Sequence, residues 1–190
     1  MKIDKSTGKI QGIHNITSPN CDDRPNSDNI SLIVIHGISI PPGRFGGDYI
    51  EQLFTNNLSI TEHPYFQEII NLRVSAHLLI NREGVLTQFV PFNKRAWHAG
   101  ESKYKGCESC NDFSIGIELE GVDDIPYTEE QYTQLAEVLQ HLYDSYPLLS
   151  RDTMTSHSDI APGRKTDPGQ AFDWEYLNLK LDIQYKLSMS

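Results

Sequence analysis

The sequence has few cysteines, and Cys21, Cys107 and Cys110 are the only three in 190 residues. An odd and small number of cysteines does not supply the disulfide framework that holds small secreted domains together. Cys107 and Cys110 have the CxxC spacing of redox pairs and of half a structural zinc site, but the sequence has no second CxxC. Two interpretations remain open: a pair of reduced thiols without a special role, which is the simpler one, and a redox or structural-metal pair.

Long hydrophobic runs are also missing from this sequence. No apolar segment approaches the roughly 18 residues that a membrane-spanning helix needs. The first residues, Met1–Ser6, are polar and lack the hydrophobic region of a secretory signal peptide. We therefore expect a cytoplasmic protein that has no membrane partner.

Positive charge is scarce, because 16 lysines and arginines stand against 26 acidic residues and the formal net charge is −10. Such a chain is repelled by nucleic acid, so we expect no nucleic-acid partner. A length of 190 residues suits a single domain with one sizeable core.

Hydrophobic periodicity predicts strands and helices that interleave along the chain. Residues 31–36 form a nearly continuous aliphatic run, typical of a strand buried on both faces, and residues 114–120 alternate between apolar and polar or small side chains. Further strands are expected at 76–80 and 85–90, as a hairpin, and near 154–157, with helices at 48–57, from Thr128 and from Asp173. Residues 91–112 are expected to form a long loop.

This pattern predicts the α/β class, with a single domain in which a mixed central β-sheet is flanked by helices. We place an N-terminal lead-in at residues 1–17 and the domain at residues 18–190. The polar stretch at 17–29 reads as an extended segment that leads into the first buried strand.

Two histidines, His36 and His157, each lie at the end of a predicted strand, where ligand sites collect in mostly parallel sheets. The segment after His157 is rich in turn-forming and ionisable residues and includes Asp167. If His36, His157 and Asp167 converge, two imidazoles and one carboxylate make a zinc set that leaves the fourth tetrahedral position open. This convergence is a hypothesis, because each residue taken alone has an ordinary structural explanation.

A hydrolase built on such a site also needs a proton acceptor and a positive charge. Glu118 projects from a strand face that carries the small residues Ser114 and Gly116, so we expect open space above it for a general base. Lys165 lies two residues before Asp167, from where it can bring positive charge to a tetrahedral intermediate.

Seven segments carry a specific resemblance when they are taken together, although none would alone. They are LIVIH at 32–36, PPGRFGG at 41–47, HPYF at 63–66, RVSAH at 73–77, KRAWHAG at 94–100, NDFSIGIELEG at 111–121 and IAPGRKTDPG at 160–169. The sequence resembles the N-acetylmuramoyl-L-alanine amidase family, which includes the peptidoglycan recognition proteins. Within that family it is most similar to the cytoplasmic enzymes that act on 1,6-anhydro-muropeptides, and the resemblance covers nearly the whole chain.

The resemblance implies one Zn²⁺ per chain, held by His36, His157 and Asp167. It implies that Glu118 is the catalytic acid and base and that Lys165 stabilises the oxyanion. The reaction would be hydrolysis of the amide bond between (anhydro)-N-acetylmuramic acid and L-alanine in peptidoglycan fragments, in cell-wall recycling. One departure is Gly37, because relatives often have asparagine after the first histidine ligand, which puts one polar substrate contact in doubt.

Further residues are candidates for contacts with the anhydro-muropeptide substrate. Arg73, Lys94 and Arg95 could bind its carboxylates, although each is also an ordinary surface charge. Trp97 and His98 could form a platform for the sugar or the peptide, and core packing is the alternative for Trp97. In relatives, the motif that contains Tyr65 is linked to the rim of the active site, so we add Tyr65 to the candidates.

We expect a monomeric enzyme, with two competing interpretations. A peptidoglycan-recognition module would bind the muropeptide without cutting it, but such modules typically lack a metal ligand, whereas this sequence has all three. A redox or structural-metal protein would depend on Cys107 and Cys110 instead.

Overall fold

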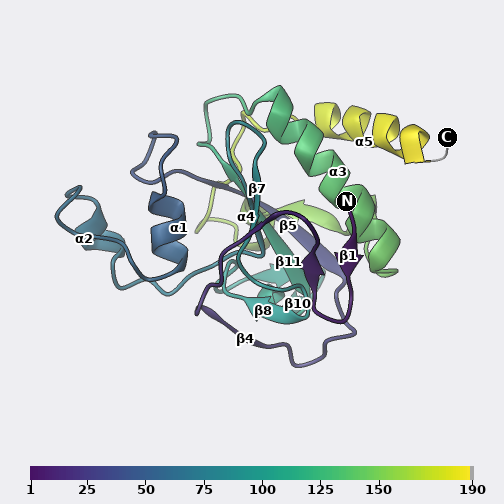
Figure 1. Ribbon diagram of the computed structural model, residues 1–190, viewed down its shortest axis with the longest axis horizontal. Helices are drawn as coiled ribbons and strands as arrows, with labels where there is room; N and C mark the ends of the chain where they lie inside the picture. The colour runs from purple at the N-terminus through teal and green to yellow at the C-terminus, as the bar shows by residue number, and fades with distance from the viewer. Residues whose placement is uncertain (189–190) are drawn as a thin grey trace.

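A computed structural model describes residues 1–188 and shows one six-stranded sheet with helices on either side (Figure 1). In spatial order, the strands of this sheet are β12 (Met154–Ser156), β5 (Leu32–Ile38), β11 (Ser114–Glu120), β6 (Leu78–Ile80), β7 (Leu86–Gln88) and β3 (His14–Asn15). Three two-stranded sheets accompany it: β1 (Ile3–Asp4) with β2 (Lys9–Ile10), β4 (Cys21–Asp23) with β8 (Lys94–Ala96), and β9 (Lys103–Tyr104) with β10 (Cys107–Glu108). The helices are α1 (Tyr49–Phe54), α2 (Phe66–Ile69), α3 (Glu129–Ser145), α4 (His157–Ile160) and α5 (Trp174–Ser188), with 3₁₀ turns η1 (Cys110–Asp112) and η2 (Arg151–Thr153).

The predicted mixed sheet is confirmed. β12, β5, β11 and β6 run parallel, and β6 and β7 form the predicted antiparallel hairpin. Gly84 at the hairpin tip has a φ of 76°, a conformation that is unstrained only without a Cβ atom. The central strands β5 and β11 are the longest of the sheet, and every residue of β11 is buried because neighbouring strands cover both of its edges.

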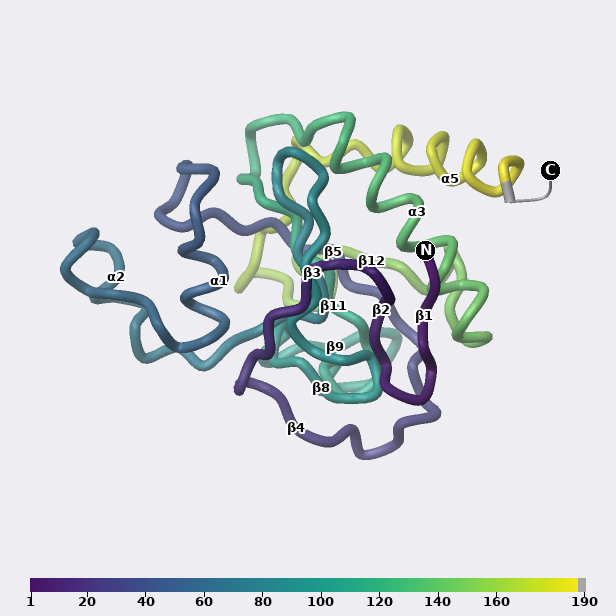
Figure 2. The backbone as a smooth tube through the Cα atoms, viewed as in Figure 1, coloured from purple at the N-terminus to yellow at the C-terminus, as the bar shows by residue number. Residues whose placement is uncertain are grey.

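The two faces of the sheet pack against different helices (Figures 1 and 2). Ile33, Ile35, Ile115, Ile117 and Leu119 pack in one cluster with the apolar side chains of α3 and α5. A second cluster lies around α1 and α2, which sit together at the opposite end of the molecule from the C-terminus. Because α3 and α5 cover one face, the polar side chains at the ends of β5 and β12 open on the other.

Helix α3 begins as its sequence predicts. The Thr128 hydroxyl accepts a hydrogen bond from the Gln131 backbone N–H, and the Gln131 side chain accepts one from the Thr128 N–H, which forms a capping box. Helix α5 buries Leu177 and Leu181 against α3, and Trp174 packs partly buried against the same cluster.

Two segments are more ordered than their sequences suggest. In the expected lead-in, residues 1–17, strand β3 joins the main sheet beside β7 and Ile10 is 2% exposed in the core. In the expected loop at 91–112, β8 pairs with β4 through the register Asp22–Arg95 and Asp23–Lys94. Strands β4 and β8 are short and carry charged side chains that pair across the strands, so their sequences show no apolar alternation. The domain boundary at residue 18 stays a prediction.

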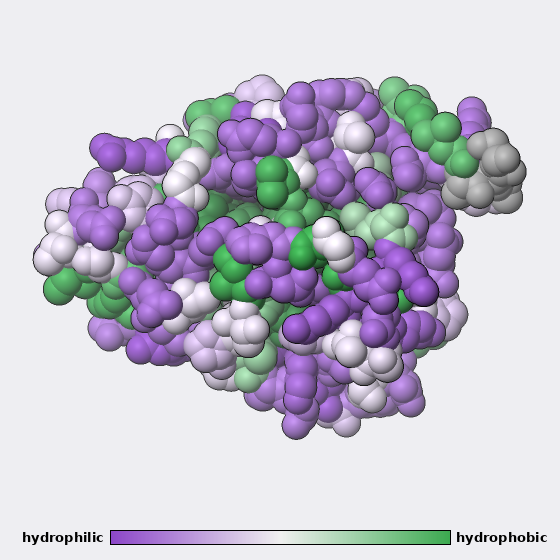
Figure 3. All heavy atoms as spheres, in the orientation of Figure 1, coloured by the Kyte–Doolittle hydropathy of each residue, from purple (hydrophilic) through white to green (hydrophobic). Residues whose placement is uncertain are grey.

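The surface seen in Figure 3 is mainly hydrophilic, with hydrophobic side chains in small groups. Exposed apolar side chains on α5 include Leu179 and Ile183. None of the helices within residues 1–188 combines the length and the hydrophobicity needed to cross a bilayer.

Candidate metal and catalytic site

The register between β5 and β11 places a histidine beside a glutamate. These strands run parallel with His36 directly opposite Glu118. His36 is 1% exposed and Glu118 is 8% exposed, and 3.9 Å separate His36 Nδ1 from Glu118 Oε1. Two adjacent buried strands therefore fix the relative position of the two side chains.

His157 and Asp167 come from the segment that follows β12, on the edge of β5 opposite β11. Strand β12 pairs with β5 up to Ser156, and His157 is the first residue of α4. The Ser156 side chain caps this helix by accepting from the Asp159 N–H, which fixes the turn that carries His157. The Ser158 N–H then donates to the Asp167 carbonyl oxygen at 3.0 Å, so the loop 161–167 returns Asp167 to the histidines.

Three ligand atoms meet at this place. His157 Nδ1 lies 2.9 Å from His36 Nδ1 and 3.0 Å from Asp167 Oδ2, and His36 Nδ1 lies 3.3 Å from Asp167 Oδ2. Metal–ligand bonds of about 2.0–2.1 Å at tetrahedral angles would separate ligand atoms by roughly 3.3 Å. The triangle formed by His36, His157 and Asp167 is therefore close to one face of a tetrahedral site, and these three residues form a possible metal-binding group.

Proton placement gives an independent test of this fit. His157 Nε2 lies 3.3 Å from the carbonyl oxygen of Ala99, which can only accept, so the ring proton belongs on Nε2. His157 Nδ1 then has a lone pair, yet it faces the Asp167 carboxylate and His36 Nδ1. Burial lowers the pKa of His36 to about 4, which keeps that ring neutral as well. At most one ring proton, on His36 Nδ1, is then left to share among His36 Nδ1, His157 Nδ1 and Asp167 Oδ2, whereas a cation would satisfy all three acceptors, so these residues have the chemistry to hold a divalent metal ion.

Glu118 is the ionisable group beside this triangle. Burial raises the pKa of Glu118 well above its ordinary value, the Asp167 carboxylate raises it further, and Lys165 opposes both. Among the residues that the structure describes, Glu118 Oε2 is buried without a hydrogen-bond partner. A carboxylate oxygen left free next to a metal site is available to take up or release a proton.

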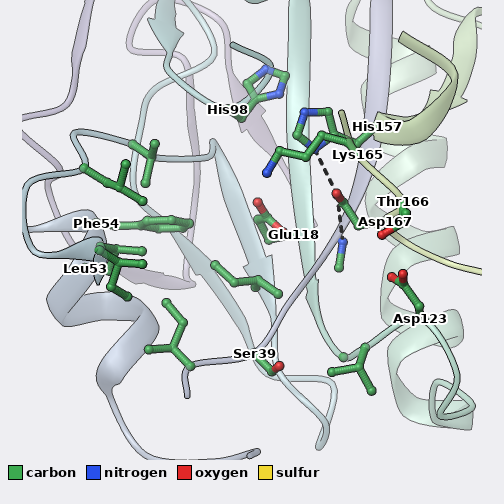
Figure 4. Close-up of a pocket in the computed structure, with 18 of the residues that line it drawn as sticks. Ser39, Leu53, Phe54, His98, Glu118, Asp123, His157, Lys165, Thr166 and Asp167 are labelled. Carbon is green, nitrogen blue, oxygen red and sulfur yellow. Dashed lines mark hydrogen bonds and ion pairs between the residues drawn. The ribbon is translucent and has the colours of Figure 1, made fainter. Parts of the chain in front are cut away.

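A cavity of about 710 Å³ opens over Glu118 and the triangle. In Figure 4 the Lys165 side chain reaches across the cavity above Glu118, while Leu53 and Phe54 form the facing wall. One side of the cavity is therefore ionic and the other is apolar. The arrangement is suited to hydrolysis of a polar bond in a ligand whose remaining parts contact the apolar wall.

The comparisons with known proteins agree with this geometry. A family model described as N-acetylmuramoyl-L-alanine amidase matches residues 26–170. The chain belongs to the N-acetylmuramoyl-L-alanine amidase family. The 1,6-anhydro-N-acetylmuramyl-L-alanine amidase AmpD of Escherichia coli (strain K12) is 56% identical over 167 residues, which cover 88% of this chain and 91% of that relative.

Two solved structures extend the comparison. The crystal structure of a selenomethionine derivative of AmpD is 52% identical to this amidase and has a TM-score of 0.91, covering 95% of this chain and 99% of that chain. AmpDh3 from Pseudomonas aeruginosa, solved in complex with anhydromuramic pentapeptide, is 25% identical with a TM-score of 0.59 and covers 82% of this chain and 61% of its own. The predicted α/β fold of this amidase is thereby confirmed.

Of the six residues expected at the substrate, the structure brings only Tyr65 and His98 to the cavity of the amidase. Arg73 is exposed and donates to the carbonyl oxygens of Ile70 and Leu72, outside the cavity lining. The expectation for Arg73 followed from its charge alone, and charge does not reveal which way a loop side chain points.

Strand β8 explains the positions of the other three. Lys94 pairs with Asp23, and Arg95 pairs with Asp22 and Asp112, so each charge is already matched. The Trp97 indole N–H donates to Asp22 Oδ1 at 3.2 Å, away from the cavity. The structure therefore does not support substrate contacts by Lys94, Arg95 or Trp97, whose pairing partners in β4 could not be identified from sequence.

His98 lines the cavity with little exposed surface, and its ring also contacts His36. It is 8% exposed, and its Nδ1 lies 2.9 Å from His36 Nε2. A Cβ atom at Gly116 would lie 2.4 Å from the His98 ring, so the space expected above Gly116 is filled by this imidazole. The sequence signal for this packing was Gly116, two residues before Glu118, because a glycine in a buried strand can mark the close approach of another side chain.

The cysteine pair contributes nothing to the site of this amidase. Cys107 is exposed on β10, whereas Cys110 is 0% exposed in an apolar cluster with Leu32 and Val34. Both are free thiols. The simpler interpretation, two reduced cysteines, agrees with this placement.

Proposed function

We propose that this amidase is zinc-dependent and hydrolyses the amide bond between (anhydro)-N-acetylmuramic acid and L-alanine in peptidoglycan fragments, in cell-wall recycling. The observation that carries the proposal is the triangle of His36, His157 and Asp167 beside the partnerless oxygen of Glu118. Two imidazoles and one carboxylate are a common ligand set of catalytic zinc, which leaves one position open.

Zinc bound by these residues supplies Lewis acidity and lowers the pKa of water to about 7. Glu118 Oε2 accepts the proton of the attacking water and returns it to the leaving nitrogen of L-alanine. Lys165 places its ammonium group near the charge that develops on the carbonyl oxygen, where it stabilises the tetrahedral intermediate. The apolar wall of Leu53 and Phe54 lines the same cavity, where it can contact the apolar parts of the substrate.

The substrate assignment is supported by the relatives. AmpD is named for its action on 1,6-anhydro-N-acetylmuramyl-L-alanine, and AmpDh3 was solved with an anhydromuramic pentapeptide. We propose the same class, anhydro-muropeptide, for this chain. A monomer acting in the cytoplasm, without nucleic-acid or membrane partners, completes the proposal.

Purified protein should be loaded with one equivalent of Zn²⁺ and incubated with anhydro-muropeptide, with the products identified by mass spectrometry. The expected products are anhydro-muramic acid and a free peptide that begins with L-alanine. A chelator should stop the reaction, and Zn²⁺ but not Mg²⁺ should restore it, because imidazole ligands suit zinc better than magnesium. Binding without cleavage would favour a recognition module, and chelator-resistant cleavage would refute zinc dependence.

A further inference from the structure

The two histidines of the metal site each have a second ring nitrogen that faces away from the cavity. His36 Nε2 lies 2.9 Å from His98 Nδ1, and His157 Nε2 lies 3.3 Å from the Ala99 carbonyl oxygen. Both partners therefore belong to consecutive residues of one segment. Histidine ligands usually donate from the ring nitrogen that is not on the metal, and the acceptor orients the ring.

One side chain, that of Asn111, binds both backbone N–H groups of this segment. Asn111 Oδ1 accepts from the backbone N–H of His98 at 3.1 Å and from that of Ala99 at 2.8 Å. Asn111 lies in η1, immediately before β11, so the segment is fixed to the strand that carries Glu118. Arg164 also donates to the Ala99 carbonyl oxygen, from the loop that carries Asp167.

The His98 ring is enclosed from the strand side. Its Nε2 lies 3.1 Å from Ser114 Oγ, and the absent Cβ of Gly116 leaves the space that the ring occupies. The ring therefore has a defined partner at each nitrogen, His36 at Nδ1 and Ser114 at Nε2. The serine hydroxyl can donate and accept at once, whereas His36 Nε2 does one or the other according to its tautomer.

The positions of the protons follow from the partners. If His36 and His157 both use Nδ1 toward the metal, each ring proton lies on Nε2. The His36 Nε2–H must then be accepted by His98 Nδ1, so His98 carries its own proton on Nε2 and donates it to Ser114 Oγ. This is a chain of neutral rings in which every proton has one place.

We propose that His98 is a positioning residue, whose unprotonated Nδ1 fixes the tautomer and the orientation of His36, and that Asn111 holds the 98–99 segment for both histidines. This inference rests on the proposed zinc site. The proposed role of His98 is to orient a metal ligand, whereas the sequence suggested a substrate platform. The segment at residues 97–100 would then act by orienting His36 and His157.

The proton positions can be measured directly on the zinc-loaded wild-type protein. Long-range ¹H–¹⁵N NMR spectra of ¹⁵N-histidine-labelled protein distinguish the two neutral tautomers and the charged ring. We expect His98 to be neutral with its proton on Nε2. A proton on Nδ1 would make His98 a donor to His36 and would overturn the proposal, and so would a doubly protonated ring.

A matched pair of variants tests the consequence for the metal. His98→Leu and His98→Asn have side chains of similar shape, but only asparagine offers an acceptor near the Nδ1 position. We expect His98→Leu to weaken zinc affinity by about 10–100-fold, the range for residues that hydrogen-bond metal ligands. His98→Asn should recover most of this loss, as measured by chelator competition with Zn²⁺ alone and by the visible spectrum of Co²⁺-loaded protein.

Each outcome separates this inference from the proposed function. Wild-type protein that binds no zinc contradicts the proposed zinc site. Wild-type protein and folded His98→Leu with equal zinc affinity contradict only the role of His98, as does an equal loss in both variants, which would indicate packing. If His98→Leu does not fold, the tautomer measurement on the wild-type protein still decides.

Discussion

At the scale of single residues, Glu118 and Glu120 point to the same side of β11 but have different surroundings. The Glu120 carboxylate accepts from the Gly46 N–H through Oε1 and from the Arg82 N–H through Oε2, so both of its oxygens are used. Within residues 1–188, Glu118 Oε2 has no such partner. Two glutamates of one strand face thus divide into one that fastens loops and one that is free for proton transfer.

This difference predicts different effects of the same substitution. Glu118→Gln should lower kcat by roughly 10²–10⁴, the usual loss of a general base, because the amide cannot accept the proton. Zinc content should stay at one per chain. Glu120→Gln should instead lower the free energy of unfolding by about 1–3 kcal/mol, since an amide NH₂ would face a backbone N–H, with a far smaller loss of kcat. Steady-state kinetics, metal analysis and urea unfolding check both, and near-normal turnover by Glu118→Gln would refute its role.

At the scale of secondary-structure elements, the longest and most periodic segments were predictable. β5, β11, the β6–β7 hairpin and α3 each have a pattern that follows from burial on one or both sides. The β4–β8 pair was not predictable, because it joins short, charged segments about 70 positions apart in the sequence.

The candidate site likewise has residues that could be predicted from the sequence and one that could not. Residue types and motif spacing predicted that five residues lie together, and the fold does bring them together: His36, Glu118, His157, Lys165 and Asp167. Their catalytic and metal-binding roles stay predictions. The role of His98 was missed, since it depends on which side chain occupies the space above Gly116. Local sequence determines which residues have suitable chemistry, whereas long-range packing decides which of them touch.

The start of α3 provides a prediction for a single element. Thr128→Ala should lower the free energy of unfolding by about 1–2 kcal/mol, as expected for loss of an N-cap. The Thr128 hydroxyl also donates to the Arg82 carbonyl oxygen, so the hairpin loses a contact as well. Thr133→Ala, at an exposed position of the same helix, is the control and should be neutral or slightly stabilising. Equal midpoints of urea unfolding for the two variants would contradict the capping role.

Helix α5 provides a second prediction, which concerns the face of the sheet that α3 and α5 cover. Leu177 is 0% exposed where α5 packs on α3, whereas Leu179 is 54% exposed on the same helix. Leu177→Ala should lower the free energy of unfolding by about 2–5 kcal/mol because it leaves a cavity. Leu179→Ala should change it by less than about 0.5 kcal/mol. Urea unfolding gives both values, and similar losses would mean that α5 does not pack as described.

At the scale of the whole molecule, the proposed metal site links parts of the chain that are far apart in sequence. Its ligands come from β5, from α4 and from the loop before α5, and the second nitrogens of both histidines reach the segment between β8 and β9. In the unfolded chain, more than 100 residues separate His36 from Asp167. Zinc should therefore bind the folded chain much more tightly than the unfolded one.

This linkage predicts that zinc stabilises the entire fold. At a free Zn²⁺ concentration of 100 times Kd, the free energy of unfolding should rise by about 2.7 kcal/mol over the metal-free protein. Thermal unfolding in zinc-buffered solutions should show a Tm that rises with the logarithm of free zinc. Mg²⁺ should give no comparable rise, because it prefers six oxygen ligands, and an equal shift with both ions would mean that stabilisation does not come from this site.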